Sequence, residues 1–193
     1  MKQTLKRTLA WLLAAGMLTC PVLAASFPDV SSSADYAEAV EYVSDIGLMV
    51  GDDQGNFNPN KTVTRAEMAT IICRMLGETE NLPKSDKFSD VPTSHWANPY
   101  VAKAAELGIV NGYGNGKFGP SDTVTYEQML AMIIRALGGE ELAKENGGYP
   151  DGYISTAVDH GLVENVSVHR GESLSRENVA IILYNCAYFS CVN

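Results

Sequence analysis

Three short segments of this chain place a hydroxyl residue directly before a charged or aromatic one. They are Thr-Val-Thr-Arg-Ala-Glu at 62–67, Thr-Val-Thr-Tyr-Glu-Gln at 123–128 and Ser-Leu-Ser-Arg-Glu-Asn at 173–178. In the first, Thr64 is typical of a helix N-cap, and Glu67 three residues later predicts a capping box. Arg65 is then the first helical residue, where its guanidinium joins unpaired backbone N–H groups and the positive end of the helix dipole. This combination suits a carboxylate or a phosphate.

The three segments differ in the residue at that first helical position. Arg176 matches Arg65, whereas Tyr126 replaces the arginine in the middle segment. We expect both arginine side chains to point outward from the helix start and to contribute little to packing. Two interpretations stay open: an anion site, or ordinary solvated residues at a helix start with no ligand.

Residues with catalytic or metal-binding chemistry do not cluster in the sequence. His95, His160 and His169 lack metal-ligand spacing, and no nucleophile motif is present. The glycine-rich segment 112–118 lacks the Ser or Thr of a phosphate-binding loop, and the acidic segment 52–56 lacks the closing Glu of a calcium loop. The acidic residues form no repeated, isolated pair of the kind that a glycosidase needs. We therefore expect no enzyme activity, no cofactor and no metal.

The N-terminal segment has the composition of a secretory signal peptide. Basic Lys2, Lys6 and Arg7 precede an apolar run and a small-residue cleavage site at 22–24. We predict a signal peptide at 1–24 and a secreted protein, with a lipoprotein processed at Cys20 as the alternative. No other stretch is apolar and long enough to span a membrane.

The chain is acidic. Its formal net charge is −9, and removing the leader, which holds three basic residues and no acidic one, lowers it to about −12. Such a chain attracts neither nucleic acid nor anionic lipid through its overall field, so only local cationic sites can hold an anionic partner. Cys73 and Cys186 stand in apolar segments and are interpreted as small core residues, with a Cys186–Cys191 bridge as the alternative.

An interval of 61 residues organises the chain. Pairs at this interval include Phe27 and Phe88, Gly47 and Gly108, Thr64 and Thr125, and Gly77 and Gly138. A third, shortened copy opens at Tyr149. Each copy reads as helix, glycine-rich loop, helix, and the second helix carries an apolar stripe too wide for one copy to bury alone. We expect an all-α fold in which the copies share a core, with 78–87 and 139–148 as connectors.

The boundaries of the first helices are also predicted. We expect the first to begin near Asp35, and the second to have Asn98 as its N-cap with Pro99 after it. Each should end at a glycine in the left-handed conformation followed by a buried apolar residue. The glycines are Gly47, Gly108 and Gly161.

These segments, taken in order, resemble S-layer homology (SLH) motifs. The resemblance rests on Phe-x-Asp-Val, His-Trp-Ala at 95–97, Leu-Gly-Ile-Val-Asn-Gly at 107–112, Gly-Lys-Phe-x-Pro at 116–120 and Thr-Arg-Ala-Glu at 64–67. It implies repeats at 25–77, 88–138 and 149–190 in a three-pronged, pseudo-threefold helical domain. It also implies a non-catalytic surface module that binds anionic, pyruvylated secondary cell-wall polysaccharide in grooves between repeats. The implied location is the cell wall or surface layer, with other surface-layer proteins as further partners.

The resemblance carries a binding role onto Arg65 and Arg176. We add six further candidates for polysaccharide binding, namely Tyr126, Trp96, Asp29, Asp90, Gly51 and Gly112. Trp96 can stack on a sugar, but a core position is the favoured interpretation, as it is for Phe57 and Phe118. Because Tyr126 lacks a charge and the third copy has a short loop, we expect at most two competent grooves.

Two other functions remain as alternatives. The first is a structural adaptor whose grooves contact another surface protein. The second is an enzyme of wall glycans, which the lack of a catalytic pair disfavours. The sequence presents an anchor without a second domain to be anchored, so we expect a protein that coats the wall alone, competes with other anchored proteins, or is a shortened relative of a larger one.

Overall fold

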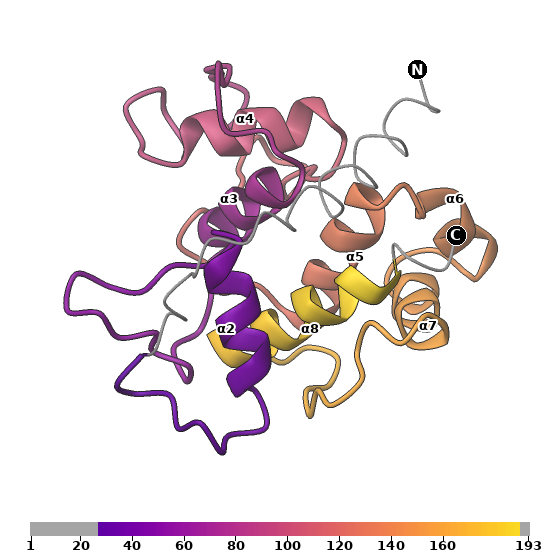
Figure 1. Cartoon of the computed structure of the whole chain (residues 1–193). Helices are drawn as coiled ribbons and strands as arrows, with labels where there is room; N and C mark the ends of the chain where they lie inside the picture. The colour runs from indigo at the N-terminus through magenta and orange to yellow at the C-terminus, as the bar shows by residue number, and fades with distance from the viewer. Residues whose placement is uncertain (1–26, 190–193) are drawn as a thin grey trace. The chain divides into compact units, whose positions relative to one another are not determined.

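The computed structural model describes residues 27–189, which contain seven α-helices and no β-strand. The helices are α2 (Ala37–Asp45), α3 (Arg65–Met75), α4 (Asn98–Glu106), α5 (Tyr126–Ala136), α6 (Glu140–Glu145), α7 (Asp151–Asp159) and α8 (Arg176–Phe189), as Figure 1 shows. The predicted all-α class is confirmed. The signal peptide at 1–24 and the Cys186–Cys191 bridge rest on residues outside the described part of the chain.

The capping box predicted at the start of α3 is present. Thr64 Oγ1 accepts from the backbone N–H of Glu67 at 3.2 Å, and the Thr64 N–H donates to Glu67 Oε2 at 2.8 Å. The other two helix starts depart from it. Ser175 Oγ accepts from Asn178 N at 3.4 Å, but Thr125, which has the same extended backbone as Thr64, makes no side-chain cap bond. The shared sequence pattern therefore gives three different helix starts, one of them without a side-chain cap.

The predicted starts of the first helix in the first and second copies differ from the observed ones by two residues and by one. The first begins at Ala37 rather than near Asp35, and its N-cap residue makes no side-chain cap bond. Asn98 lies inside the first turn of α4 instead of capping it. Its Nδ2 donates to Ser85 O at 2.6 Å and to Val91 O at 2.7 Å, so the amide ties the connector to the segment before the helix.

The predicted left-handed ends of these helices are confirmed. Gly47, Gly108 and Gly161 have φ values of 73°, 74° and 70°. The N–H of the apolar residue that follows each glycine donates back to the helix, over distances of 2.8 Å, 2.9 Å and 2.9 Å, and that residue is buried. The donors are Leu48, Ile109 and Leu162, and the acceptors are the carbonyls of Val43, Ala104 and Ala157.

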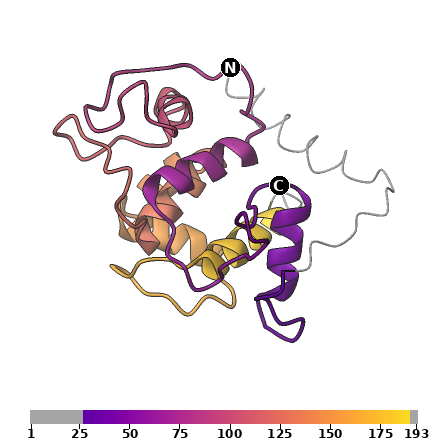
Figure 2. The same cartoon turned by 90° about the vertical axis from the view of Figure 1, so that its left-hand side faces the viewer.

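The chain folds into two compact units that cut across the sequence copies. One consists of residues 27–61, Ala157–Val168 and 175–189, and the other of Thr62–Thr156 and His169–Leu174. In the first, α2 packs against α8, as Figures 1 and 2 show, with Tyr42 and Tyr184 edge to face at 5.4 Å. In the second, α3 packs against α4 and α5. In both units, therefore, the most extensive helix packing joins helices of different copies.

The loops between the paired helices contribute to the core. Phe57 and Phe118 are fully buried, as predicted, and pack against the Phe residues that open their copies. The ring centroids lie 5.3 Å apart for Phe27 and Phe57, and 5.5 Å apart for Phe88 and Phe118. All seven helices within residues 27–189 add buried apolar residues, with the largest share from α3, α5 and α8. Cys73 and Cys186 are among them, so their predicted core positions are confirmed.

Three residues that precede the helix caps form a closed ring of backbone hydrogen bonds within the second unit. The Val63 N–H donates to Leu174 O at 3.0 Å, Val124 N–H to Val63 O at 2.9 Å, and Leu174 N–H to Val124 O at 3.1 Å. All three residues are buried and hold equivalent positions in the three copies. Local sequence patterns did not predict this ring, because each bond joins residues at least 50 positions apart.

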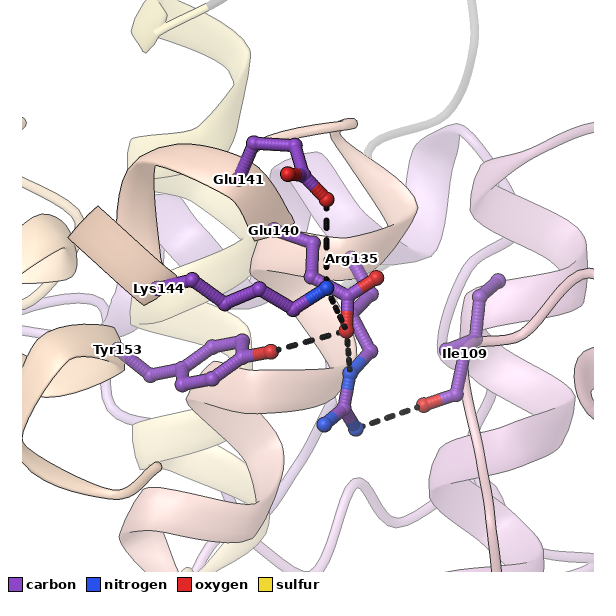
Figure 3. Close-up of polar contacts among 6 residues, drawn as sticks. All are labelled: Ile109, Arg135, Glu140, Glu141, Lys144 and Tyr153. Carbon is purple, nitrogen blue, oxygen red and sulfur yellow. Dashed lines mark hydrogen bonds and ion pairs between the residues drawn. The ribbon is translucent and has the colours of Figure 1, made fainter. Parts of the chain in front are cut away.

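The connector expected at 139–148 contains a short helix, α6, that polar contacts attach to its neighbours (Figure 3). Glu140 Oε1 accepts from the Tyr153 hydroxyl at 3.2 Å and lies 3.4 Å from Arg135 Nε. Arg135 Nη1 in turn donates to Ile109 O at 3.2 Å. Glu140 thereby connects α5, α6 and the start of α7. None of the helices within 27–189 combines the length and the apolar character needed to cross a bilayer.

Candidate functional site

Arg65 lies at the centre of the candidate site. As predicted, it is the first residue of α3, but its side chain is buried, with 7% of its surface exposed, so the expected outward orientation is wrong. Arg65 Nε donates to Phe118 O at 2.9 Å, and Nη1 donates to Gln128 Oε1 at 2.9 Å. The guanidinium thus reaches from the end of the first copy into the loop and second helix of the second copy.

Two aromatic rings flank this guanidinium. Its central carbon lies 4.7 Å from the centroid of the Tyr113 ring and 4.8 Å from that of Phe118, within the range of cation–π attraction. Phe118 is buried, whereas 47% of Tyr113 is exposed. The Tyr113 hydroxyl donates to Asp122 Oδ2 at 2.8 Å, which fixes the ring beside the arginine. The site therefore has one core wall and one solvent-facing wall.

The Arg65 charge has no counter-ion within residues 27–189. Each salt bridge in this part of the chain involves other cations. Burial lowers the pKa of the Arg65 guanidinium, although neighbouring groups, Tyr113 and Asp122 foremost, partly offset this effect. Neither acceptor of its two hydrogen bonds carries a charge, and in the described residues Nη2 makes no hydrogen bond. A buried and unpaired cation is costly, so this arrangement favours an anionic ligand.

Arg176 repeats part of this geometry in the other unit. It is the first residue of α8 and is half-buried, so the expected outward orientation is wrong here too. Its Nε donates to Phe57 O at 2.6 Å, and Nη2 donates to Val50 O at 2.7 Å. The guanidinium carbon lies 4.5 Å from the Phe57 ring centroid. Each arginine therefore bonds to the carbonyl of a buried loop Phe and packs on its ring.

Tyr126 occupies the equivalent position in the second copy. It is the first residue of α5 and is buried, and this burial raises the pKa of its hydroxyl. Its backbone N–H donates to Glu172 O at 2.9 Å. The side chain brings no positive charge to this helix start, and the weakness of the middle position stays a prediction.

Asp29 and Asp90 hold the loops against the arginines. Asp29 accepts from the backbone N–H groups of Phe57 and Asn58 at 2.8 Å and 2.6 Å. Asp90 accepts from those of Phe118 and Gly119, both at 2.8 Å. Burial alone would raise the pKa of Asp90, but backbone N–H donors, those of Phe118 and Gly119 foremost, together with the charge of Lys117 outweigh it, and the pKa is lowered. Each carboxylate therefore fixes the Phe whose carbonyl receives an arginine.

Gly51 and Gly112 allow the close approach of a protein ring. A Cβ on Gly51 would lie 2.8 Å from Phe27 Cε1, and one on Gly112 would lie 2.6 Å from Phe88 Cε1. Gly112 also has a φ of 68°, which disfavours other residues. Both glycines were predicted to take part in polysaccharide binding, and the structure places an aromatic ring of the same copy against each of them.

Trp96 is exposed, so its predicted core position is wrong. The exposed fraction of this residue is 59%, and the indole stacks on His95 at a centroid distance of 5.8 Å. The next residue, Ala97, takes the buried position instead. A solvent-facing indole has the shape and polarity to stack on a sugar ring.

Two residues of the site, Gln128 and Tyr113, were not among the candidates predicted from the sequence. Gln128 was interpreted only as part of a helix start, and Tyr113 as part of a glycine-rich loop. Gln128 stands at the third helical position, where the first copy has Glu67. The replacement of an acid by an amide at this position is the sequence signal for Gln128. It points to the site only once Arg65 of the first copy is known to contact the second copy.

Comparison with known proteins matches the S-layer homology domain family at residues 26–69 and 87–130. A cell surface protein of Thermoanaerobacter kivui is 38% identical over an alignment that covers 81% of this chain and 20% of that protein. An S-layer protein of Bacillus thuringiensis subsp. finitimus is 31% identical over 70% of this chain and 16% of its own length. A cellulosome-anchoring protein of Acetivibrio thermocellus is 33% identical over 58% of this chain and 26% of its own length.

These matches identify two S-layer homology repeats in the chain, in the regions where the sequence predicts the first and second copies. The family match and these relatives indicate that the chain is located at the cell surface, in association with the cell wall. The chain spans about a fifth or less of the length of the first two of these relatives. The family match does not extend over 149–190, so the third repeat stays a prediction.

Proposed function

We propose that this chain is a non-catalytic module that attaches to the cell wall by binding an anionic secondary wall polysaccharide. The observation that carries the proposal is the buried Arg65 guanidinium, which has no counter-ion in the described residues and an Nη2 that makes no hydrogen bond there. A carboxylate of a pyruvyl ketal on the polymer supplies the missing charge and accepts from the guanidinium. The acidic protein has no bulk attraction for such a polymer, so the affinity resides in this local site.

The proposed binding surface uses residues of several kinds. Arg65 and Arg176 receive the acidic groups, and Trp96 stacks on a sugar ring. Tyr126 lines a third position without a charge, which gives two competent sites. Asp29, Asp90, Gly51 and Gly112 shape the loops that hold the arginines, which is a supporting role rather than direct contact.

The proposed architecture is a pseudo-threefold arrangement of three repeats at 25–77, 88–138 and 149–190. The ring of hydrogen bonds among Val63, Val124 and Leu174 supports it, because three equivalent positions each donate once and accept once. The packing of α2 on α8 and of α3 on α4 supports it as well, because each pair joins two copies. We also propose that residues 1–24 are a signal peptide.

Co-sedimentation with purified walls of the producing bacterium tests the proposal. The protein is mixed with intact walls, with walls after mild acid treatment that removes ketal-linked acids, and with walls stripped of secondary polymer. The proposal predicts binding to intact walls, at least tenfold weaker binding after acid treatment, and none to stripped walls. Equal binding to all three would contradict it and would favour a protein partner in the envelope.

A further inference from the structure

Gln128 makes a contact that its position in the helix does not explain. It is the third residue of α5, where a side chain ordinarily returns to cap the helix start. Glu67 does so for Thr64, and Asn178 donates to Ser175 Oγ at 2.6 Å. Gln128 instead accepts from Arg65 Nη1 at 2.9 Å, and Thr125 Oγ1 is left buried without a hydrogen-bond partner. The Gln128 side chain therefore binds Arg65 and leaves the start of its own helix without a side-chain cap.

The chemistry of this contact keeps the site positively charged. A guanidinium only donates, so the amide oxygen of Gln128 faces Arg65, and its Nε2 group has no acceptor among residues 27–189. A glutamate at the same place would accept the same hydrogen bond and neutralise the buried charge. The nearby carboxylates form no ion pair with Arg65, because Asp122 accepts from the Tyr113 hydroxyl and Asp90 accepts from two backbone N–H groups. Their charges favour the protonated guanidinium only through space.

We propose that Gln128 determines the charge preference of the Arg65 site. As a neutral acceptor it fixes the orientation of the guanidinium and leaves the positive charge to an acidic group of the ligand, a carboxylate or a phosphate on the wall polymer. Gln128 is a positioning residue for Arg65, and its free amide N–H groups are available to the same ligand. This inference rests on the proposed function.

Gln128→Glu tests the inference, because it changes one atom and adds one negative charge. The affinity for intact walls is measured by sedimentation at low and moderate salt, and stability is measured by thermal melting. We expect binding at least tenfold weaker than the parent, with a smaller salt dependence, and an unchanged or higher melting temperature because Arg65 gains a counter-ion. Weaker binding with equal or greater stability is a result that a purely structural role does not produce.

Two further variants complete the experiment. Gln54→Glu makes the same chemical change at an exposed loop residue, and it should bind walls like the parent. Gln128→Met removes the acceptor without adding charge, so it should melt lower than the parent yet bind walls more tightly than Gln128→Glu. A Gln128→Glu variant that binds as tightly as the parent, or that melts below it, overturns the role of Gln128. A parent that does not bind walls at all instead contradicts the proposed function, and this inference with it.

Discussion

Arg65 shows how a residue's role depends on partners far away in the sequence. At the start of α3 its guanidinium was expected in solvent, yet the carbonyl of Phe118, 53 residues later, and the amide of Gln128, 63 residues later, draw it inward. Burying a charge without a counter-ion costs free energy, and here the cost is tolerated at a helix start whose own dipole is also positive. These features together support the proposal that Arg65 serves a binding site rather than a structural ion pair.

Asp90 allows a test of how the loop beside Arg65 is held. Asp90→Asn removes one of two carboxylate acceptors and places an amide donor against a backbone N–H. We expect a loss of about 1–2 kcal/mol in the free energy of unfolding by urea denaturation. Asp86→Asn, at an exposed connector position for which the structure shows no side-chain hydrogen bond, is the matched control and should change little. Equal stability of the two variants would contradict the supporting role of Asp90.

The Asp90 carboxylate also makes the stability of this loop depend on pH. Because the folded-state pKa of Asp90 is lowered, its stabilising contribution is complete above the pKa of the unfolded chain, about 3.9. It is lost as the pH falls through the folded-state value. The difference in unfolding free energy between the parent and Asp90→Asn should therefore be largest near neutral pH and shrink below about pH 4.

At the scale of the element, signals carried by neighbouring residues were the ones that sequence could predict. The capping box of α3 and the glycine ends at Gly47, Gly108 and Gly161 depend on residues within one turn, and all are present. The failures involve distant partners. Asn98 bonds to the connector instead of capping α4. The segment of α6 was expected to be a plain connector, because the contacts of Glu140 with Arg135 and Tyr153 join it to other helices and leave no pattern in its own sequence.

The glycine-rich loop of the second copy provides a test of close packing. Gly112→Ala puts a Cβ 2.5 Å from Lys117 O and 2.6 Å from the Phe88 ring, whereas Gly114→Ala meets no atom within 4 Å. Both residues have a positive φ, 68° and 82°, so both variants carry backbone strain of the same kind. We expect Gly112→Ala to be less stable than Gly114→Ala by about 1–3 kcal/mol, measured by urea denaturation. Equal losses would show that the loop moves aside freely.

Glu140 provides a test of how α6 is attached. Glu140→Ala removes the acceptor shared by Tyr153 and Arg135, which connects α6 to two other helices. Because this carboxylate is partly exposed, we expect a loss of about 1 kcal/mol in unfolding free energy. Glu141→Ala removes only an exposed pair with Lys144 and should cost less than about 0.5 kcal/mol. A larger effect at Glu141 than at Glu140 would contradict this assignment.

At the scale of the whole molecule, neither compact unit is a continuous piece of chain. Helix α2, near the start of the described residues, packs on α8 near their end. Deleting residues 149–193 removes α8 and should expose the buried face of α2, which includes Val40 and Val43. We expect the fragment to aggregate or to lack fixed packing, as judged by size-exclusion chromatography and near-ultraviolet circular dichroism. A monomeric fragment with one cooperative melting transition would contradict the sharing of structure between copies.

Wall binding by the double variant Arg65→Met, Arg176→Met tests the central claim most directly. Methionine retains most of the side-chain length and removes the charge, and circular dichroism establishes that the variant is folded. Loss of a charge-assisted contact of about 1.5–3 kcal/mol predicts a drop in affinity of about ten- to a hundredfold in sedimentation with intact walls. The Arg65→Lys, Arg176→Lys variant should recover only part of it, because lysine lacks the planar fork. A folded double methionine variant that sediments with walls as well as the parent would contradict binding through these arginines.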